Sequence, residues 1–312
     1  MKRATIVDVA KLANVSTATV SRVLHTDYPV KDQTRERVLE AVRKLDYEVD
    51  LTARSLKMDS THLIGLIVPD ISNAYFMNIA SALERVLRKN KYVMLCLNSD
   101  ESYRREQTLL HSLRQYKVDG LVVVSCCTRT GFSAQGIEAQ IPCVLIDSEC
   151  ADGDVAVVGT DERASMVALT EYLIRQGHRK IAILHGNLQQ HTGYERRQGF
   201  LKAMEKHGLE VLPEFELVAN FSREKAEAQV RKLLAGKKHL PDALICSSNL
   251  MAQGALSELR RQGVGIPEEI SLVSYDPLCA PGLMEREITH MSDISEKIGR
   301  KAGELLLNRT VK

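Results

Sequence analysis

Residues 16–24 place hydrogen-bonding side chains between apolar ones at helical spacing. Val20, Val23 and Leu24 fall on one side of a predicted helix, so the residues between them point outward. These outward residues are small or hydrogen-bonding: Thr17, Ala18, Thr19, Ser21 and Arg22. Hydroxyl groups of this kind contact phosphates, and an arginine can bond to both acceptors of a guanine. The segment therefore fits a DNA major groove, although an ordinary helical hairpin in a protein core gives the same apolar spacing.

Three short helices are predicted to position this segment. Ile6, Val9, Ala10 and Ala13 form the apolar face of a first helix, and Thr5 with Asp8 resembles a capping box at its start. A tight turn at residues 14–16 follows, and Ser16 is a good N-cap for the second helix. A third helix is predicted over residues 32–45. Together they make a small domain, near the lower size limit for independent folding.

Residues 47–61 contain helix formers but too little apolar surface to fold alone. Asp50 is a candidate cap, and Leu56 is expected to be a lone exposed leucine.

From residue 62 onward, short apolar runs alternate with amphipathic helices. The predicted strands cover 63–68, 92–97, 119–125, 143–147, 155–159, 180–184, 215–219, 242–246 and 271–275. The predicted helices cover 74–90, 104–116, 163–176, 194–207, 223–235, 250–262 and 295–308. This alternation indicates parallel sheets with helices on both faces. Two such sets predict two doubly wound lobes with a ligand cleft at the carboxyl ends of the strands.

The chain shows no catalytic or cofactor motif. It lacks G-x-S-x-G, G-x-x-x-x-G-K-[ST], a G-x-G-x-x-G after a strand, and any H-x-x-x-H pair among its nine histidines. Its seven cysteines are odd in number and without C-x-x-C spacing, which favours buried thiols over metal ligands or disulfides. We therefore expect no enzyme activity, no cofactor and no metal site.

Residues 5–60 resemble the DNA-binding headpiece and hinge of the lactose-repressor (LacI/GalR) family of bacterial transcription regulators. That family begins close to T-I-x-D-V-A-x-x-A-x-V-S-x-x-T-V-S-R-V-L, and fourteen residues of 5–24 match it. Ala53-Arg54-Ser55-Leu56 matches the hinge, and the resemblance continues through DISNAYF (70–76), GHRKIAIL (177–184) and IPEEISLVSYD (266–276). It implies an all-α helix-turn-helix headpiece followed by a two-lobed α/β effector module like periplasmic sugar-binding proteins.

The resemblance implies roles for the headpiece and hinge. Thr17, Ala18 and Arg22 would face base edges, while Thr5, Ser16, Thr19 and Ser21 would contact phosphates. Arg54 would meet phosphates or bases, and Leu56 would insert into a central minor-groove step and kink it. For any one basic residue, plain surface charge is an equally good explanation.

Residues implied as ligand contacts are weighed against structural roles. Arg196 has a planar fork of donors suited to a hydroxyl or carboxylate, and Asp147 and Asp276 end strands where a carboxylate can accept from sugar hydroxyls. Either aspartate can instead cap a turn or helix. The remaining implied pocket residues are Tyr75, Phe76, Phe221 and Asn249. Core packing is an equally good role for Phe76.

Four departures from the family pattern stand out. Val49-Asp50 replaces the usual Pro-Asn before the hinge helix, and Lys31 stands where a capping Ser or Thr is usual. Asn249 replaces an Asp that is frequent in the family, which changes the preferred ligand. The last predicted helix, over residues 295–308, should return to the first lobe. Relatives typically continue for about one strand beyond this helix.

We predict three domains: a headpiece (1–46), a hinge (47–61) and an effector and dimerisation domain (62–312). Residues 1–60 carry 11 basic and 9 acidic residues, so the chain's net charge of +2 lies in this part. No apolar run approaches membrane-spanning length, and we expect a cytoplasmic homodimer. The predicted partners are a near-palindromic DNA operator and a small-molecule effector, such as a sugar. The alternative is a cytoplasmic sugar- or nucleoside-binding protein without a DNA-binding role.

Overall fold

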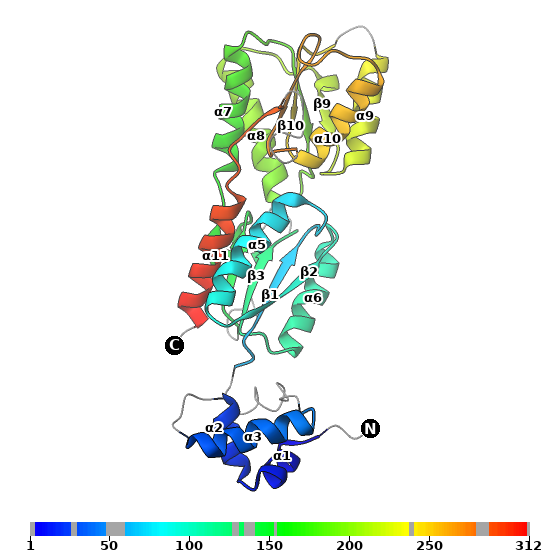
Figure 1. Cartoon of the computed structure of the whole chain (residues 1–312). Helices are drawn as coiled ribbons and strands as arrows, with labels where there is room; N and C mark the ends of the chain where they lie inside the picture. Colours follow the sequence, from blue (N-terminus) through cyan, green and yellow to red (C-terminus); the bar gives the residue numbers. More distant parts are fainter. Residues whose placement is uncertain are drawn as a thin grey trace. The chain divides into compact units, whose positions relative to one another are not determined.

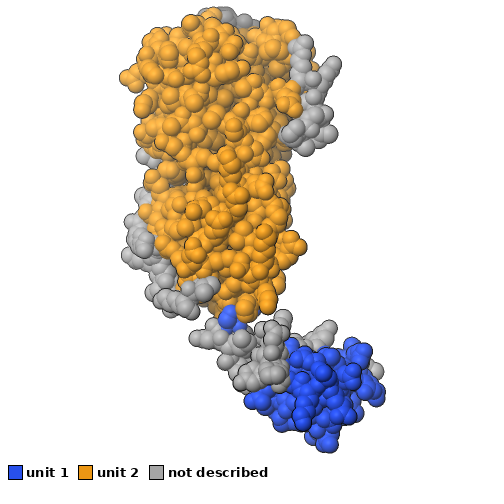
Figure 2. Space-filling model, turned by 60° about the vertical axis from the view of Figure 1, so that its left-hand side comes forward, with its two compact units in different colours: residues 1–61 blue, residues 62–312 orange. Residues whose placement is uncertain are grey.

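A computed structural model describes most of the chain. It covers residues 4–25, 30–47, 60–126, 131–133, 141–152, 155–236, 240–278 and 287–310. The chain divides into two compact units, residues 1–61 and residues 62–312 (Figures 1 and 2). The predicted hinge contacts Arg54 and Leu56, and the Val49-Asp50 departure, lie outside the described residues.

In its described residues, the first unit contains three helices: α1 (Ile6–Ala13), α2 (Thr17–His25) and α3 (Asp32–Lys44). Thr5 and Asp8 form the predicted capping box of α1, and the Ser16 hydroxyl accepts the backbone N–H of Thr19 at 3.2 Å at the start of α2. Lys31, the N-cap residue of α3, makes no side-chain capping hydrogen bond. The small core is made by Val9, Ala10, Ala13, Val20, Val23, Val38 and Ala41.

The second unit contains two five-stranded parallel sheets, one in each lobe. The first has the order β2-β1-β3-β5-β7 and the second the order β12-β11-β10-β8-β9. The strands of the first sheet are β1 (Leu63–Val68), β2 (Val93–Asn98), β3 (Gly120–Val124), β5 (Cys143–Ile146) and β7 (Ala156–Val158). Those of the second are β8 (Ile181–His185), β9 (Glu216–Val218), β10 (Ala243–Cys246), β11 (Ser271–Ser274) and β12 (Thr289–His290). The central strands are apolar on both faces because helices cover both sides.

The helices of the second unit match the predicted ones within three residues at each end. They are α5 (Ala74–Lys89), α6 (Tyr103–Gln115), α7 (Glu162–Arg175), α8 (His191–Lys206), α9 (Arg223–Ala235), α10 (Asn249–Arg261) and α11 (Ser295–Thr310). Four very short elements were not predicted: β4 (Phe132–Ser133), β6 (Cys150–Asp152), β12 and the 3-10 helix η1 (Pro213–Phe215). Two or three residues are too few to give a periodic pattern. Among the described helices, none has the length and apolarity to cross a membrane.

The last helix, α11, returns to the first lobe as predicted and lies beside α5 (Figure 1). Its residues Ile298, Ala302 and Leu306 belong to the same buried cluster as β1 and α5. The two helices approach closely at Gly299, where a Cβ atom would collide with the carbonyl oxygen of Ile79. The chain therefore passes between the lobes twice, between β7 and α7 and between β12 and α11.

Replacing Leu306 by Ala should weaken this packing, because the side chain is fully buried. Loss of the buried methyl groups and the resulting cavity cost about 2–5 kcal/mol. Thermal unfolding monitored by circular dichroism should show a lowered midpoint. Lys301→Ala is the matched control on the exposed side of the same helix and should change stability by less than about 0.5 kcal/mol. Equal midpoints for both variants would show that α11 does not stabilise the first lobe.

Candidate functional site

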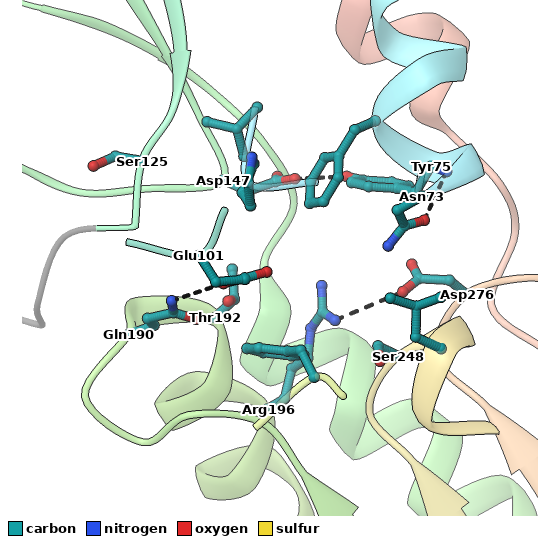
Figure 3. A pocket seen from close by; sticks show the side chains of 15 residues that line it. Asn73, Tyr75, Glu101, Ser125, Asp147, Gln190, Thr192, Arg196, Ser248 and Asp276 are labelled. Carbon is teal, nitrogen blue, oxygen red and sulfur yellow. Dashed lines mark hydrogen bonds and ion pairs between the residues drawn. The ribbon is translucent and has the colours of Figure 1, made fainter. Parts of the chain in front are cut away.

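A pocket lies between the two lobes at the carboxyl ends of both sheets, where open α/β sheets bind ligands (Figure 3). It encloses about 620 Å³ of empty space when its open mouth is included. The lining residues are Pro69, Asn73, Tyr75, Phe76, Glu101, Val124, Ser125, Asp147, Gln190, Thr192, Arg196, Phe221, Ser248, Leu250 and Asp276.

Six of the seven predicted ligand residues line this pocket: Tyr75, Phe76, Asp147, Arg196, Phe221 and Asp276. The first three come from the first lobe and the other three from the second. The structure thus brings together residues that are up to about two hundred positions apart in the chain. Asn249 is the exception, because it is buried beside the pocket and bonds to the opposite lobe.

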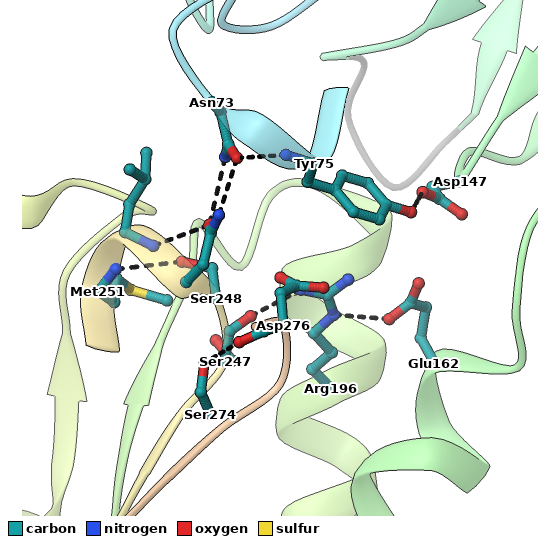
Figure 4. Close-up of polar contacts among 12 residues, drawn as sticks. Asn73, Tyr75, Asp147, Glu162, Arg196, Ser247, Ser248, Met251, Ser274 and Asp276 are labelled. Atoms are coloured by element: carbon teal, nitrogen blue, oxygen red, sulfur yellow. Dashed lines mark hydrogen bonds and ion pairs between the residues drawn. The ribbon is translucent and has the colours of Figure 1, made fainter. Parts of the chain in front are cut away.

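Arg196, on α8, is held by the protein itself (Figure 4). Its Nε donates to Glu162 Oε2 at 2.6 Å and its Nη1 donates to the carbonyl oxygen of Ser247 at 2.6 Å. The guanidinium lies over the ring of Tyr275, with Cζ 3.7 Å from the ring centroid, and Nη1 is 3.8 Å from Asp276 Oδ2. The orientation of Arg196 is therefore fixed without a ligand.

Asp147 follows β5 in a left-handed backbone conformation, with φ of 49°. Its Oδ2 accepts the hydroxyl of Tyr75 at 2.6 Å, whereas its buried Oδ1 has no hydrogen-bond partner among the described residues. Burial, followed by the nearby Glu162 carboxylate, raises the pKa of Asp147 from 3.8 to about 7. Burial also raises the pKa of Asp276 to about 6, although Arg196 acts in the opposite direction. Both carboxyl groups therefore titrate near neutral pH.

Polar contacts join the lobes around the pocket. Asn249 Nδ2 donates to Asn73 Oδ1 at 2.9 Å, and Asn73 Nδ2 donates to Asn249 Oδ1 at 3.3 Å (Figure 4). Gln190 Nε2 donates to Glu101 Oε2 at 3.1 Å at the exposed rim (Figure 3). The reciprocal amide pair is buried, so opening the lobes would expose two amides that have satisfied each other.

The aromatic residues form the apolar walls of the pocket. Tyr75 and Phe76 belong to the first turn of α5 and contact each other edge to face, with ring centroids 5.4 Å apart. Phe221 follows β9 with φ of 59° and packs over Gly186, where a Cβ atom would overlap its ring. Flat apolar faces of this kind suit a sugar ring or a base.

Sequence reasoning missed several residues that shape the site, notably Glu162, Asn73, Gln190 and Tyr275. Asn73 and Gln190 are the N-cap residues of α5 and α8. Their positions just before predicted helices that follow strands could have marked them as candidate pocket residues. Glu162 gave no signal, because its importance comes from pairing with a side chain 34 residues away.

In the first unit, α2 presents the predicted base-reading residues to solvent. Thr17, Ala18 and Arg22 are exposed, while Val20 and Val23 on the opposite side are buried. A helix with a buried face and a free outer face fits the recognition helix of a helix-turn-helix.

The predicted phosphate contacts are partly engaged within the unit. The Thr5 hydroxyl donates to Asp8 Oδ2 at 2.6 Å, and the hydroxyls of Ser16 and Thr19 bond to each other at 2.9 Å. Thr5 and Ser16 are exposed, and Thr19 and Ser21 are half-buried. Thr5, Ser16 and Thr19 thus lie at the two helix N-termini, where backbone N–H groups favour phosphate, whereas Ser21 lies in the middle of α2.

Family models match both units. Residues 5–50 match the bacterial regulatory proteins of the lacI family, and residues 61–311 match the periplasmic binding proteins and sugar binding domain of the LacI family. The chain belongs to the LacI family. It is a DNA-binding transcriptional regulator with a periplasmic-binding-protein-like effector domain, as the sequence predicted.

Individual relatives and solved structures agree with this assignment. The HTH-type transcriptional repressor PurR of Vibrio cholerae serotype O1 is 33% identical over 310 residues, which cover 98% of this chain and 91% of the relative. PurR of Haemophilus influenzae is 34% identical over 307 residues, covering 98% and 91%.

Two solved structures share the fold of this LacI-family chain. The lac repressor dimer bound to operator and the anti-inducer ONPF has a TM-score of 0.83 and 22% identity, covering 99% of this chain and 93% of that one. The complex of transcriptional regulator CelR with cellobiose has a TM-score of 0.69 and 26% identity, with the same coverage. The predicted helix-turn-helix with two parallel α/β lobes is thus confirmed.

The raised pKa of Asp147 predicts a pH-dependent stability. Between about pH 4 and 7 the unfolded chain loses the Asp147 proton while the folded chain keeps it, so this group lowers stability as pH rises. Asp147→Asn does not titrate and still offers an acceptor to Tyr75. Relative to the parent chain, the variant should gain up to about 1.4 kcal/mol per pH unit in this window and level off above pH 7.

Thermal midpoints of the parent chain and of Asp147→Asn, measured from pH 5 to pH 8, test this expectation. A difference that stays constant with pH would show that the Asp147 carboxyl titrates as it does in the unfolded chain.

Proposed function

We propose that this LacI-family regulator is a cytoplasmic homodimeric repressor whose affinity for a near-palindromic operator is controlled by a small molecule bound between the lobes. The observation that carries the proposal is the pocket itself, whose walls come from both lobes. A ligand that touches both walls favours the closed arrangement, so ligand binding and lobe position are linked. We find no reason to assign it a catalytic role, in keeping with relatives that are repressors.

The pocket chemistry and the comparisons support a sugar or sugar derivative as effector. Asp147 and Asp276 supply acceptors from opposite lobes, Arg196 supplies donors, and Phe221 supplies a flat apolar face. This combination of carboxylates and aromatic faces suits a ring with several hydroxyls. The similar structure of CelR in complex with cellobiose is consistent with it.

On the DNA side, each copy would insert α2 into a major groove. Thr17, Ala18 and Arg22 would contact base edges, and Thr5, Ser16, Thr19 and Ser21 would contact phosphates. The hinge residues Arg54 and Leu56 would add minor-groove contacts. Two copies related by two-fold symmetry would match a palindromic site, and effector binding would release it.

Arg22→Ala should reduce operator affinity and relax base preference. An operator is first selected from a random DNA pool with the parent protein, and affinities are then measured by gel shift at fixed salt. Loss of a bidentate guanine contact costs about 1–3 kcal/mol, or about 5- to 150-fold.

Arg37→Ala, which removes the same charge from the exposed face of α3, is the matched control for Arg22→Ala and should have a smaller effect. Equal losses in the two variants would indicate general electrostatic attraction rather than base recognition.

Asp276→Asn should abolish the response to the effector while sparing basal DNA affinity. In a thermal-shift screen of sugars, an effector at about 100 times its Kd adds about 2.7 kcal/mol to parental stability. We choose Asp276 rather than Arg196 because removing Arg196 would leave Glu162 buried without a counter-charge, which destabilises the fold. A hit that stabilises Asp276→Asn as strongly as the parent would place the effector elsewhere.

A further inference from the structure

The pocket between the lobes has more negative than positive charge. Asp147 and Asp276 line it, and Glu162 is buried directly behind Arg196. Among the described residues that line the pocket, Arg196 is the only cation. Glu101 also lines the pocket at its rim, so among the described residues four carboxylates share one guanidinium, and negative charge exceeds positive charge when they are ionised.

The position of Arg196 increases this imbalance on the side of Asp147. Its Nε lies 2.6 Å from Glu162 and its Nη1 lies 3.8 Å from Asp276, so its charge is directed to these two groups. Asp147 receives only the neutral hydroxyl of Tyr75, and its buried Oδ1 has no hydrogen-bond partner among the described residues. A buried carboxylate oxygen in this situation calls for a proton or for a donor from a ligand.

A neutral sugar satisfies only part of this need. Its hydroxyl can donate one hydrogen bond to the carboxylate of Asp147, but it leaves the excess negative charge in a partly dehydrated pocket. An ammonium group offers both the donors and the charge, and the ring of Phe221 or Phe76 can contact its adjacent carbon atoms.

We propose that the effector is an amino sugar or a similar small hydroxylated amine whose cationic nitrogen lies against Asp147, with Asp276 as a second carboxylate in the same pocket. This inference rests on the proposed function of the pocket as the effector site. It narrows the effector class from sugars in general to those that carry a basic nitrogen, and it excludes sugar phosphates, which would add negative charge.

Binding of such a cation should also release protons. The groups that face Asp147 are Tyr75 from α5, Glu162 from α7, Arg196 from α8 and Asp276 after β11. The first is a neutral donor, and only Arg196 is cationic. Since the pKa of Asp147 lies at about 7 in the free protein, an incoming ammonium would displace part of a proton at neutral pH.

Isothermal titration calorimetry on the full chain tests the proposal. Sets of three related sugars are compared, and each sugar is titrated separately. Glucosamine, N-acetylglucosamine and glucose share one ring, and the galacto and manno series extend the panel. We expect the amine of at least one series to bind about tenfold or more tighter than its acetylated and hydroxyl counterparts. Binding heats measured in phosphate and in HEPES at pH 7 are then compared. They should reveal proton release when the amine binds and none when the other two sugars bind.

Two variants link the preference to Asp147. Asp147→Asn should remove the advantage of the amine over the neutral sugar, whereas Asp100→Asn, an exposed carboxylate on the same lobe, should keep it. Thermal midpoints confirm that both variants are folded.

The outcomes separate this inference from the proposed function. Tighter binding of a neutral sugar, no binding by any amine of the panel, or an amine preference that survives in Asp147→Asn overturns the amine assignment, while the regulatory function stands. An amine that binds as expected but leaves operator affinity unchanged supports the assignment and contradicts the proposed regulatory function.

Discussion

The buried ion pair between Glu162 and Arg196 sets the geometry on which the pocket depends. Glu162 is the first residue of α7, directly after the chain passes from the first lobe to the second, and Arg196 lies on the adjacent helix α8. Buried pairs add little net stability compared with well-packed apolar side chains, so the contribution of this pair is positional. It directs the guanidinium toward Asp276 and the Tyr275 ring, so that among the described residues Asp147 accepts its side-chain hydrogen bond from the neutral hydroxyl of Tyr75 rather than from Arg196.

The same arrangement connects ligand binding with lobe position. The pocket has walls from both lobes, and the reciprocal amide bonds of Asn73 and Asn249 join the lobes beside it. These two amides satisfy each other without any charged group, whereas the rim contact between Gln190 and Glu101 includes a carboxylate. Recognition of the ligand charge then falls to Asp147 and Asp276, which face the pocket from opposite sides.

Most of the fold was predictable because its signals are local. The helices of both units follow from apolar spacing and from caps such as Thr5 with Asp8, and the buried strands follow from short apolar runs. Very short elements such as β12 carry too few residues for a periodic pattern. The pocket positions of Arg196 and Phe221 came from the family resemblance rather than from spacing.

The sequence by itself determined which segments become strands and helices, and it put Asp147 and Asp276 at the carboxyl ends of strands. Only the tertiary structure decided what these side chains meet: Glu162 pairs with Arg196, Asn249 bonds to Asn73, and one oxygen of Asp147 has no donor within the described part of the chain. The physical reason is distance along the chain. Secondary structure depends on neighbours within a few residues, whereas the charge balance of a buried site depends on side chains brought together from 34 to 176 positions apart.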